Sequence, residues 1–135
     1  MRKSEITAEF DAEITTVWNR VTDNVHYEWR SDLDRIVLSE GGERFTEYTK
    51  DGYATEFTIT VKEFCKRYEF DMENKIFSGH WTGIFTELEG GRTRIDFTEV
   101  LHMKNPVMEL LSYLFMNLRK MQKAYVDDLR KALGE

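Results

Sequence analysis

The sequence predicts an α+β protein in which a seven-stranded, curved antiparallel sheet wraps around a long C-terminal helix. Three observations lead to this prediction. Apolar and polar residues alternate along successive short segments, which is typical of half-buried strands. Turns rich in glycine and polar residues separate these segments, so neighbouring strands should run antiparallel. After residue 105 the apolar side chains repeat at helical spacing instead.

The chain is expected to begin with a strand and two short helices. Residues 4–10 alternate between apolar and polar side chains and predict the strand. Asp11 is expected to cap a helix whose apolar face lies within residues 14–21, because a carboxylate can accept hydrogen bonds from the free amides of a first helical turn. Asp23 is expected to cap a second short helix that ends near Trp29.

A meander of hairpins should follow. Six further strands are expected over residues 33–39, 44–50, 53–61, 68–72, 77–85 and 95–101. In the last hairpin, a three-residue loop at residues 89–91 would pair Phe85 with Ile95, whereas a two-residue loop would pair Phe85 with Asp96. The first register places apolar side chains together on one face and is therefore predicted. It also sets Trp81 opposite Glu99.

One continuous helix is predicted from Pro106 to about Leu133. Asn105 is a suitable cap, proline is favoured at the first helical position, and Gly134 is a suitable stop. The stripe of this helix that faces the sheet is expected to contain Val107, Leu111, Leu114, Leu118, Met121 and Tyr125. Because the meander is much wider than one helix, the sheet must curve, and such curvature can leave an internal space.

Composition limits the classes of function. With 135 residues, 41% of them hydrophobic and 13% aromatic, the chain can form one domain over residues 1–135 with a real core. The net charge of −6 disfavours nucleic acid as a partner. The single cysteine excludes a disulfide framework and a zinc site built from several thiolates. Neither a membrane-spanning apolar run nor a signal peptide is present, so a cytoplasmic location is expected.

Several segments carry a resemblance that covers almost the whole chain. They are residues 10–12 leading to Val17 and Trp18, residues 29–33, Glu47, residues 79–83, residues 93–97 and the capped final helix. Together they resemble the START-like helix-grip superfamily (SRPBCC), which includes the birch-pollen allergen and the polyketide cyclase/dehydrase and lipid-transport proteins. The resemblance implies a cavity for a small apolar or amphipathic molecule. The phosphate-binding glycine loop of the plant allergens is not carried over, since Gly41-Gly42 is only a short turn.

The inner face of the sheet supplies most of the candidate ligand-binding residues. These candidates are Phe57, Tyr68, Phe70, Gly79, Trp81, Gly83, Phe97, Glu99, Leu111 and Phe115. The aromatic side chains would form the cavity wall, and the two glycines would remove side-chain volume beside it. Two alternatives remain open: the aromatic residues simply form a packed core, and the glycines only allow the strand to bend.

Glu99, Glu47 and Tyr68 are weak catalytic candidates. Glu99 alternates with apolar residues and should point inward, where burial would raise its pKa and suit acid–base chemistry. A structural ion pair or a position near the open rim is the more common role for such a carboxylate. No nucleophile–base pair, cofactor motif or metal-ligand spacing is present. We therefore expect no cofactor and no metal, and a binding protein rather than an enzyme.

The expected function is non-covalent binding of a small hydrophobic or amphipathic molecule between the sheet and the C-terminal helix. One alternative is a cyclase or dehydratase that uses inner carboxylates, and another is a protein-interaction module of the chaperone-regulator or toxin type. Met108, Tyr113 and Met116 add apolar surface beyond one buried helix face. This excess favours a homodimer contact or a mobile gate at the start of the helix, unless neighbouring loops cover it.

Overall fold

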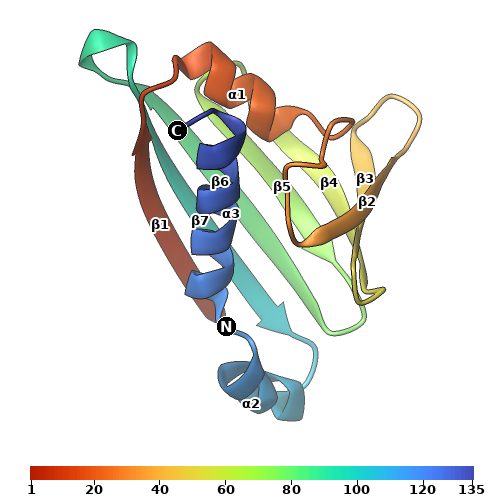
Figure 1. Cartoon of the computed structure of the whole chain (residues 1–135). Helices are drawn as coiled ribbons and strands as arrows, with labels where there is room; N and C mark the ends of the chain where they lie inside the picture. Colours follow the sequence, from red (N-terminus) through yellow and green to blue (C-terminus); the bar gives the residue numbers. More distant parts are fainter.

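The alternating segments form seven strands of one antiparallel sheet, and the computed structural model describes all 135 residues (Figure 1). The strands are β1 (Arg2–Phe10), β2 (Leu33–Leu38), β3 (Arg44–Thr49), β4 (Ala54–Glu63), β5 (Arg67–Glu73), β6 (Phe77–Glu87) and β7 (Thr93–Met103). The helices are α1 (Ile14–Thr22), α2 (Pro106–Phe115) and α3 (Leu118–Ala132), with a single 3₁₀ turn at Glu89–Gly91. The predicted α+β helix-grip fold is confirmed.

The strand order is β1-β7-β6-β5-β4-β3-β2, so the first strand pairs with the last and the rest follow as a meander. The predicted register of the last hairpin is confirmed, because Phe85 lies opposite Ile95 and Trp81 lies opposite Glu99. Its loop needs positive φ angles at Gly90 (77°) and Gly91 (75°), a conformation that glycine adopts readily. The sheet curves, and α3 lies across its concave face (Figure 1).

The segment between β1 and β2 differs from the prediction. Helix α1 forms, but Asp11 does not cap it, and the capping position at Glu13 makes no side-chain hydrogen bond. The backbone N–H of Asp11 instead donates to the carboxylate of Glu135 at 2.8 Å. The predicted second helix is absent: the carboxylate of Asp23 accepts hydrogen bonds from the N–H groups of Val25 and His26, which closes a turn rather than starting a helix. Residues 23–32 therefore form a loop.

The predicted C-terminal helix is broken in two. Helix α2 ends at Phe115, and α3 starts at Leu118, where the side chain of the capping residue Asn117 accepts a hydrogen bond from the N–H of Lys120 at 3.0 Å. The guanidinium of Arg2 donates to the carbonyl oxygens of Ser112 and Met116, at 2.8 and 2.7 Å, and so satisfies the end of α2. The break has no proline or glycine to signal it. A side chain from the opposite end of the sequence stabilises it.

Because of this break, the predicted apolar stripe is wrong over much of its length. Leu118 is buried as predicted, but the other residues that α3 buries are Gln122, Val126 and Leu129, which were not in the predicted stripe. Helix α2 lies beyond the end of the sheet (Figure 1), and its apolar side chains are largely in solvent. The exposed members of the predicted stripe are Val107, Leu111, Leu114 and Met121. Val107, Leu111 and Leu114 belong to α2, and the departure of α2 from the sheet leaves them without a partner surface, whereas Met121 lies on α3 at the cavity.

The two inner-face glycines of β6 open no void. A Cβ at Gly83 would lie 2.6 Å from the ring of Trp81 and 3.2 Å from that of Phe97. A Cβ at Gly79 would lie 2.7 Å from a methyl group of Leu101 and from the carbonyl oxygen of Val100. Each glycine thus allows a close approach of neighbouring groups, and those groups fill the space. Gly83 sets the position of the Trp81 ring.

We predict that Gly83→Ala lowers the free energy of unfolding by about 2 kcal/mol, because the new methyl group overlaps the Trp81 ring. Urea denaturation measures the change. In a Trp81→Leu background the same substitution should cost clearly less, since the overlapping ring is gone. An equal cost in both backgrounds would show that the ring is not the constraint.

Candidate functional site

A cavity of about 300 Å³ lies between the concave face of the sheet and α3. Its lining comes from the end of α1, the loop of residues 23–32, strands β3 to β7 and helix α3. The volume is at the small end of the range seen for ligand sites. The curvature of the sheet leaves this space because α3 covers only part of the width of the concave face.

Six of the ten predicted ligand-binding residues line this cavity, and four do not. Those that line it are Phe57, Tyr68, Phe70, Trp81, Phe97 and Glu99. Gly79 and Gly83 lie beneath neighbouring side chains. The prediction that Leu111 and Phe115 line the cavity is wrong, because both lie on α2, where Phe115 is 81% exposed. Their exclusion follows directly from the break between α2 and α3.

Aromatic rings form the apolar wall of the cavity. Phe45 and Phe57 stack with their ring centroids 4.8 Å apart, and Phe70 and Trp81 stack at the same distance. The ring of Tyr68 meets that of Phe70 edge-on at 5.6 Å. Phe57 also meets Phe70 edge-on at 5.2 Å, so each ring of the wall packs against a neighbouring ring, face to face or edge-on. Such a wall suits a ligand with an apolar, ring-containing body.

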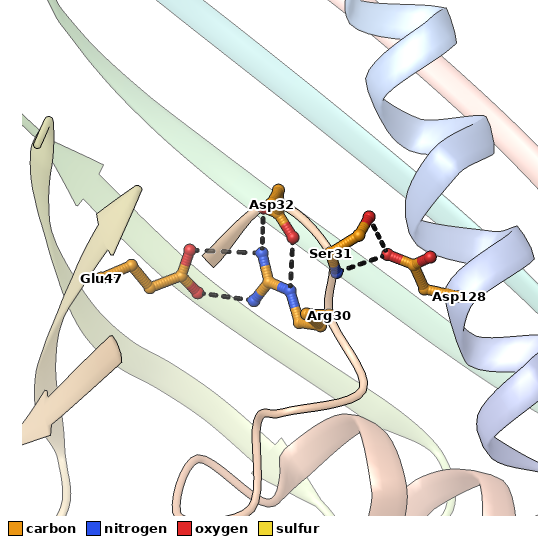
Figure 2. Close-up of polar contacts among 5 residues, drawn as sticks. All are labelled: Arg30, Ser31, Asp32, Glu47 and Asp128. Atoms are coloured by element: carbon orange, nitrogen blue, oxygen red, sulfur yellow. Dashed lines mark hydrogen bonds and ion pairs between the residues drawn. The ribbon is translucent and has the colours of Figure 1, made fainter. Parts of the chain in front are cut away.

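The polar side of the cavity is organised by Arg30, in the loop before β2 (Figure 2). Its guanidinium holds the carboxylate of Glu47 through two contacts of 2.8 and 3.3 Å, and that of Asp32 through two more of the same lengths. The side chains of Arg30 and Glu47 are only 15% and 14% exposed. Burial opposes the charge of Arg30, but Glu47 and Asp32 outweigh it, so the pKa of Arg30 is raised and its guanidinium stays charged.

The loop that carries Arg30 also contacts α3. The backbone N–H and the hydroxyl of Ser31 both donate to the carboxylate of Asp128, at 2.8 and 2.7 Å (Figure 2). The Arg30 guanidinium lies 5.1 Å from the ring centroid of Tyr125, and Trp29 meets the same ring edge-on. This loop therefore joins β3 to α3 along one side of the cavity.

Neither Arg30 nor Asp128 was predicted from the sequence to have a functional role. Arg30 belongs to the run of residues 29–33 that contributed to the family resemblance, but nothing local marks it as the partner of Glu47. The two residues are far apart in sequence and meet only when the loop folds over β3. For Glu47, the structural ion pair that the sequence left open as an alternative is the observed arrangement.

Glu99 is the carboxyl group of the cavity that receives no hydrogen bond from the protein. It is half-buried on β7, directly opposite Trp81 on β6. Burial, reinforced by the negative charge of Glu47, raises the pKa of Glu99 to about 7. Glu99 can therefore exchange a proton near neutral pH, or receive a donor group from a bound molecule.

Tyr68 is a weaker candidate for proton transfer. Its hydroxyl lies 3.4 Å from the side-chain nitrogen of Asn24, which is a long hydrogen bond. Burial raises the pKa of Tyr68 above its ordinary value, so the phenol stays protonated at neutral pH. It can orient a ligand through its hydroxyl group, but it is poorly suited to act as a base.

The histidines lie outside this site. His80 is on the outer face of β6, between the carboxylates of Asp71 and Glu69, each 2.7 Å away. Burial would lower the pKa of His80, but these two hydrogen bonds outweigh it and the pKa is raised. No group of three or more His, Cys, Asp or Glu side chains is arranged to hold a metal ion. None of the helices combines the length and apolar character of a membrane span.

Comparisons with known proteins agree with this architecture. A family model described as "Polyketide cyclase / dehydrase and lipid transport" matches residues 1–134. No curated protein sequence matches the chain. Among solved structures, the protein XoxI from Bacillus cereus is similar with a TM-score of 0.78 and 16% identity, covering 98% of this chain and 95% of the other. At such low identity the likeness concerns the fold alone.

Two further structures extend the comparison. A START superfamily protein from Mycobacterium smegmatis has a TM-score of 0.76 and 12% identity, over 96% of this chain and 95% of the other. The Zhui aromatase/cyclase from Streptomyces sp. R1128 has a TM-score of 0.77 and 14% identity, over 98% and 92%. The predicted resemblance to the START-like helix-grip superfamily is confirmed at the level of the fold.

We predict that Glu99→Gln raises the free energy of unfolding at pH 8 by about 2 kcal/mol. The folded protein binds a proton at Glu99 between pH 4.5, the ordinary pKa of a glutamate, and pH 7, whereas the unfolded chain does not. The contribution of Glu99 to stability therefore falls as the pH rises through that window, and removing the charge abolishes the loss. Urea denaturation at pH 4.5 and at pH 8 gives the free energy of unfolding of each protein at each pH. Glu63→Gln, at the exposed end of β4, is the control and should change neither value.

Proposed function

The chain belongs to the polyketide cyclase/dehydrase and lipid transport family, and from this premise we propose that it is a one-domain protein that binds a small amphipathic molecule. The observation that carries the proposal is the cavity of about 300 Å³, with stacked aromatic rings on one side and charged groups on the other. Apolar walls with a few convergent polar groups are the usual composition of a small-molecule site.

The two sides of the cavity support a ligand with two different ends. The wall formed by Phe45, Phe57, Phe70 and Trp81 favours an apolar, ring-containing body. Glu99 lies beside that wall without a hydrogen-bond donor from the protein, and a donor group of the ligand would satisfy it. A purely apolar molecule would leave this carboxyl group unsatisfied.

Acid–base catalysis on the bound molecule is the second candidate function, and Glu99 is the observation that favours it. A carboxyl group with a pKa near 7 that faces a ligand cavity is suited to proton transfer at neutral pH. The names of similar structures include an aromatase/cyclase. Turnover that is lost in Glu99→Gln while binding persists would identify an enzyme, and retained turnover would exclude Glu99 as the catalytic group.

We also propose that α2 mediates a homodimer. Its apolar side chains Leu110, Leu114 and Phe115 are 66%, 71% and 81% exposed, and they lie on a helix that projects beyond the sheet. Two copies of such a helix can pack against each other around a twofold axis, which is the commonest symmetry of soluble oligomers. Helix α2 contributes no residue to the cavity, so the dimer would leave ligand entry unobstructed.

To test ligand binding, we predict that Ala124→Trp reduces uptake of the fluorescent probe N-phenyl-1-naphthylamine at least about tenfold. Ala124 lies on α3 at an exposed edge of the cavity, where an indole ring would occupy the entrance. Lys123→Trp adds the same ring to the adjacent, outward-facing position and should leave uptake unchanged. Equal uptake by both variants would place the probe outside this cavity.

The dimer is tested separately by Phe115→Lys, which introduces a charge into the exposed face of α2. We predict that sedimentation of the variant gives half the mass of the wild-type protein, because burying an unpaired ammonium group in an apolar interface is unfavourable. Val25→Lys alters an exposed apolar residue far from α2 in sequence and should leave the mass unchanged. A wild-type protein that is already monomeric at micromolar concentration would contradict the proposal.

A further inference from the structure

We propose that the cavity selects cationic amphiphiles, in which an apolar, ring-containing body carries an ammonium group, and that Glu99 receives the ammonium group. This inference rests on the proposed binding function and specifies the chemical class of its ligand. Three independent features of the lining lead to it: its charge balance, the hydrogen-bond state of each carboxylate, and the position of the aromatic rings relative to Glu99.

The charge balance of the lining is strongly negative. A single guanidinium, that of Arg30, stands against the carboxylates of Asp32, Glu47, Glu99 and Asp128, and neither lysine nor histidine lines the cavity. All three nitrogens of the Arg30 guanidinium already donate to Glu47 or Asp32. A ligand carboxylate or phosphate would therefore meet an excess of negative charge without a free cationic partner, and its binding would be opposed.

The hydrogen bonds then single out Glu99 among these carboxylates. Glu47 and Asp32 are held by Arg30, and Asp128 is held by the backbone N–H and hydroxyl of Ser31. Glu99 has no such partner in the protein, and its half-buried side chain lines the cavity. The missing partner must be a donor, and an ammonium group supplies both the hydrogen bonds and the opposite charge.

The aromatic rings next to Glu99 explain why the cation should carry an apolar body. Trp81 lies directly across from Glu99 in the β6–β7 pair, and its ring contacts that of Phe97 with centroids 4.7 Å apart. Trp81 also stacks with Phe70 at 4.8 Å, so its faces are taken up by neighbouring rings and the group acts as an apolar packing surface. A cation held at Glu99 would thus lie close to the aromatic wall against which its apolar body packs. A neutral alcohol gains the hydrogen bond but not the electrostatic attraction.

Three probes with the same ring system test the proposal: 2-naphthylmethylamine, 2-naphthalenemethanol and 2-naphthoic acid. Their affinities are measured by calorimetry at pH 8, where the amine is protonated and Glu99 is ionised. We expect the amine to bind at least about tenfold more tightly than the alcohol, and the alcohol more tightly than the acid. Competition between the amine and N-phenyl-1-naphthylamine reports whether both occupy the cavity.

Two variants test whether Glu99 causes the preference for the amine over the alcohol. In Glu99→Gln the amine should lose its advantage over the alcohol, while the affinity of the alcohol changes by less than about twofold. Asp127→Asn removes one negative charge from an exposed position of α3 outside the cavity and should preserve the advantage. Circular dichroism establishes that both variants are folded.

The outcomes separate this inference from the proposed function. If the acid binds as well as the amine, or if the amine and the alcohol bind equally, charge selection is overturned and the binding function remains. If Glu99→Gln retains the amine preference, Glu99 is not the site of the ammonium group. If none of the three probes binds and N-phenyl-1-naphthylamine does not bind either, the binding function is overturned together with the inference.

Discussion

The buried guanidinium of Arg30 is the constraint on which the cavity depends. A charge that is largely withdrawn from water must keep opposite charges around it, and Glu47 and Asp32 supply them. This requirement fixes the loop of residues 23–32 above β3, and Ser31 then joins the same loop to Asp128 on α3 (Figure 2). Loss of Arg30 would leave Glu47 unpaired and would release the side of the cavity that the loop forms.

The cavity is lined both by aromatic rings and by carboxylates, and the rings cannot donate hydrogen bonds to the carboxylates. The stacked rings form an apolar wall, while the carboxylates of the same lining require hydrogen-bond donors. The protein resolves this conflict for three carboxylates through Arg30 and Ser31, but it leaves Glu99 beside Trp81 without a partner. Burial and the charge of Glu47 make Glu99 easier to protonate, so its charge state is sensitive to pH and to whatever occupies the cavity.

The break between α2 and α3 has a comparable effect on the outside of the molecule. Arg2 satisfies the last carbonyl groups of α2, and Asn117 starts α3 in a new direction. The apolar residues of α2 consequently leave the sheet and become a separate surface at the end of the molecule (Figure 1). The cavity and the exposed apolar surface therefore belong to different helices.

The sequence alone determined the strands, their antiparallel order and the register of the last hairpin, because alternation and turn residues act over short distances. It also indicated the inner face, and hence the aromatic wall and Glu99. It could not determine the absence of a second short helix, the break before Asn117 or the pairing of Arg30 with Glu47. The missing helix reflects a local competition, in which the Asp23 carboxylate closes a turn instead of capping a helix. The break and the Arg30–Glu47 pair depend on partners far apart in the chain, such as Arg2 with Met116, and only tertiary structure brings such groups within hydrogen-bonding distance.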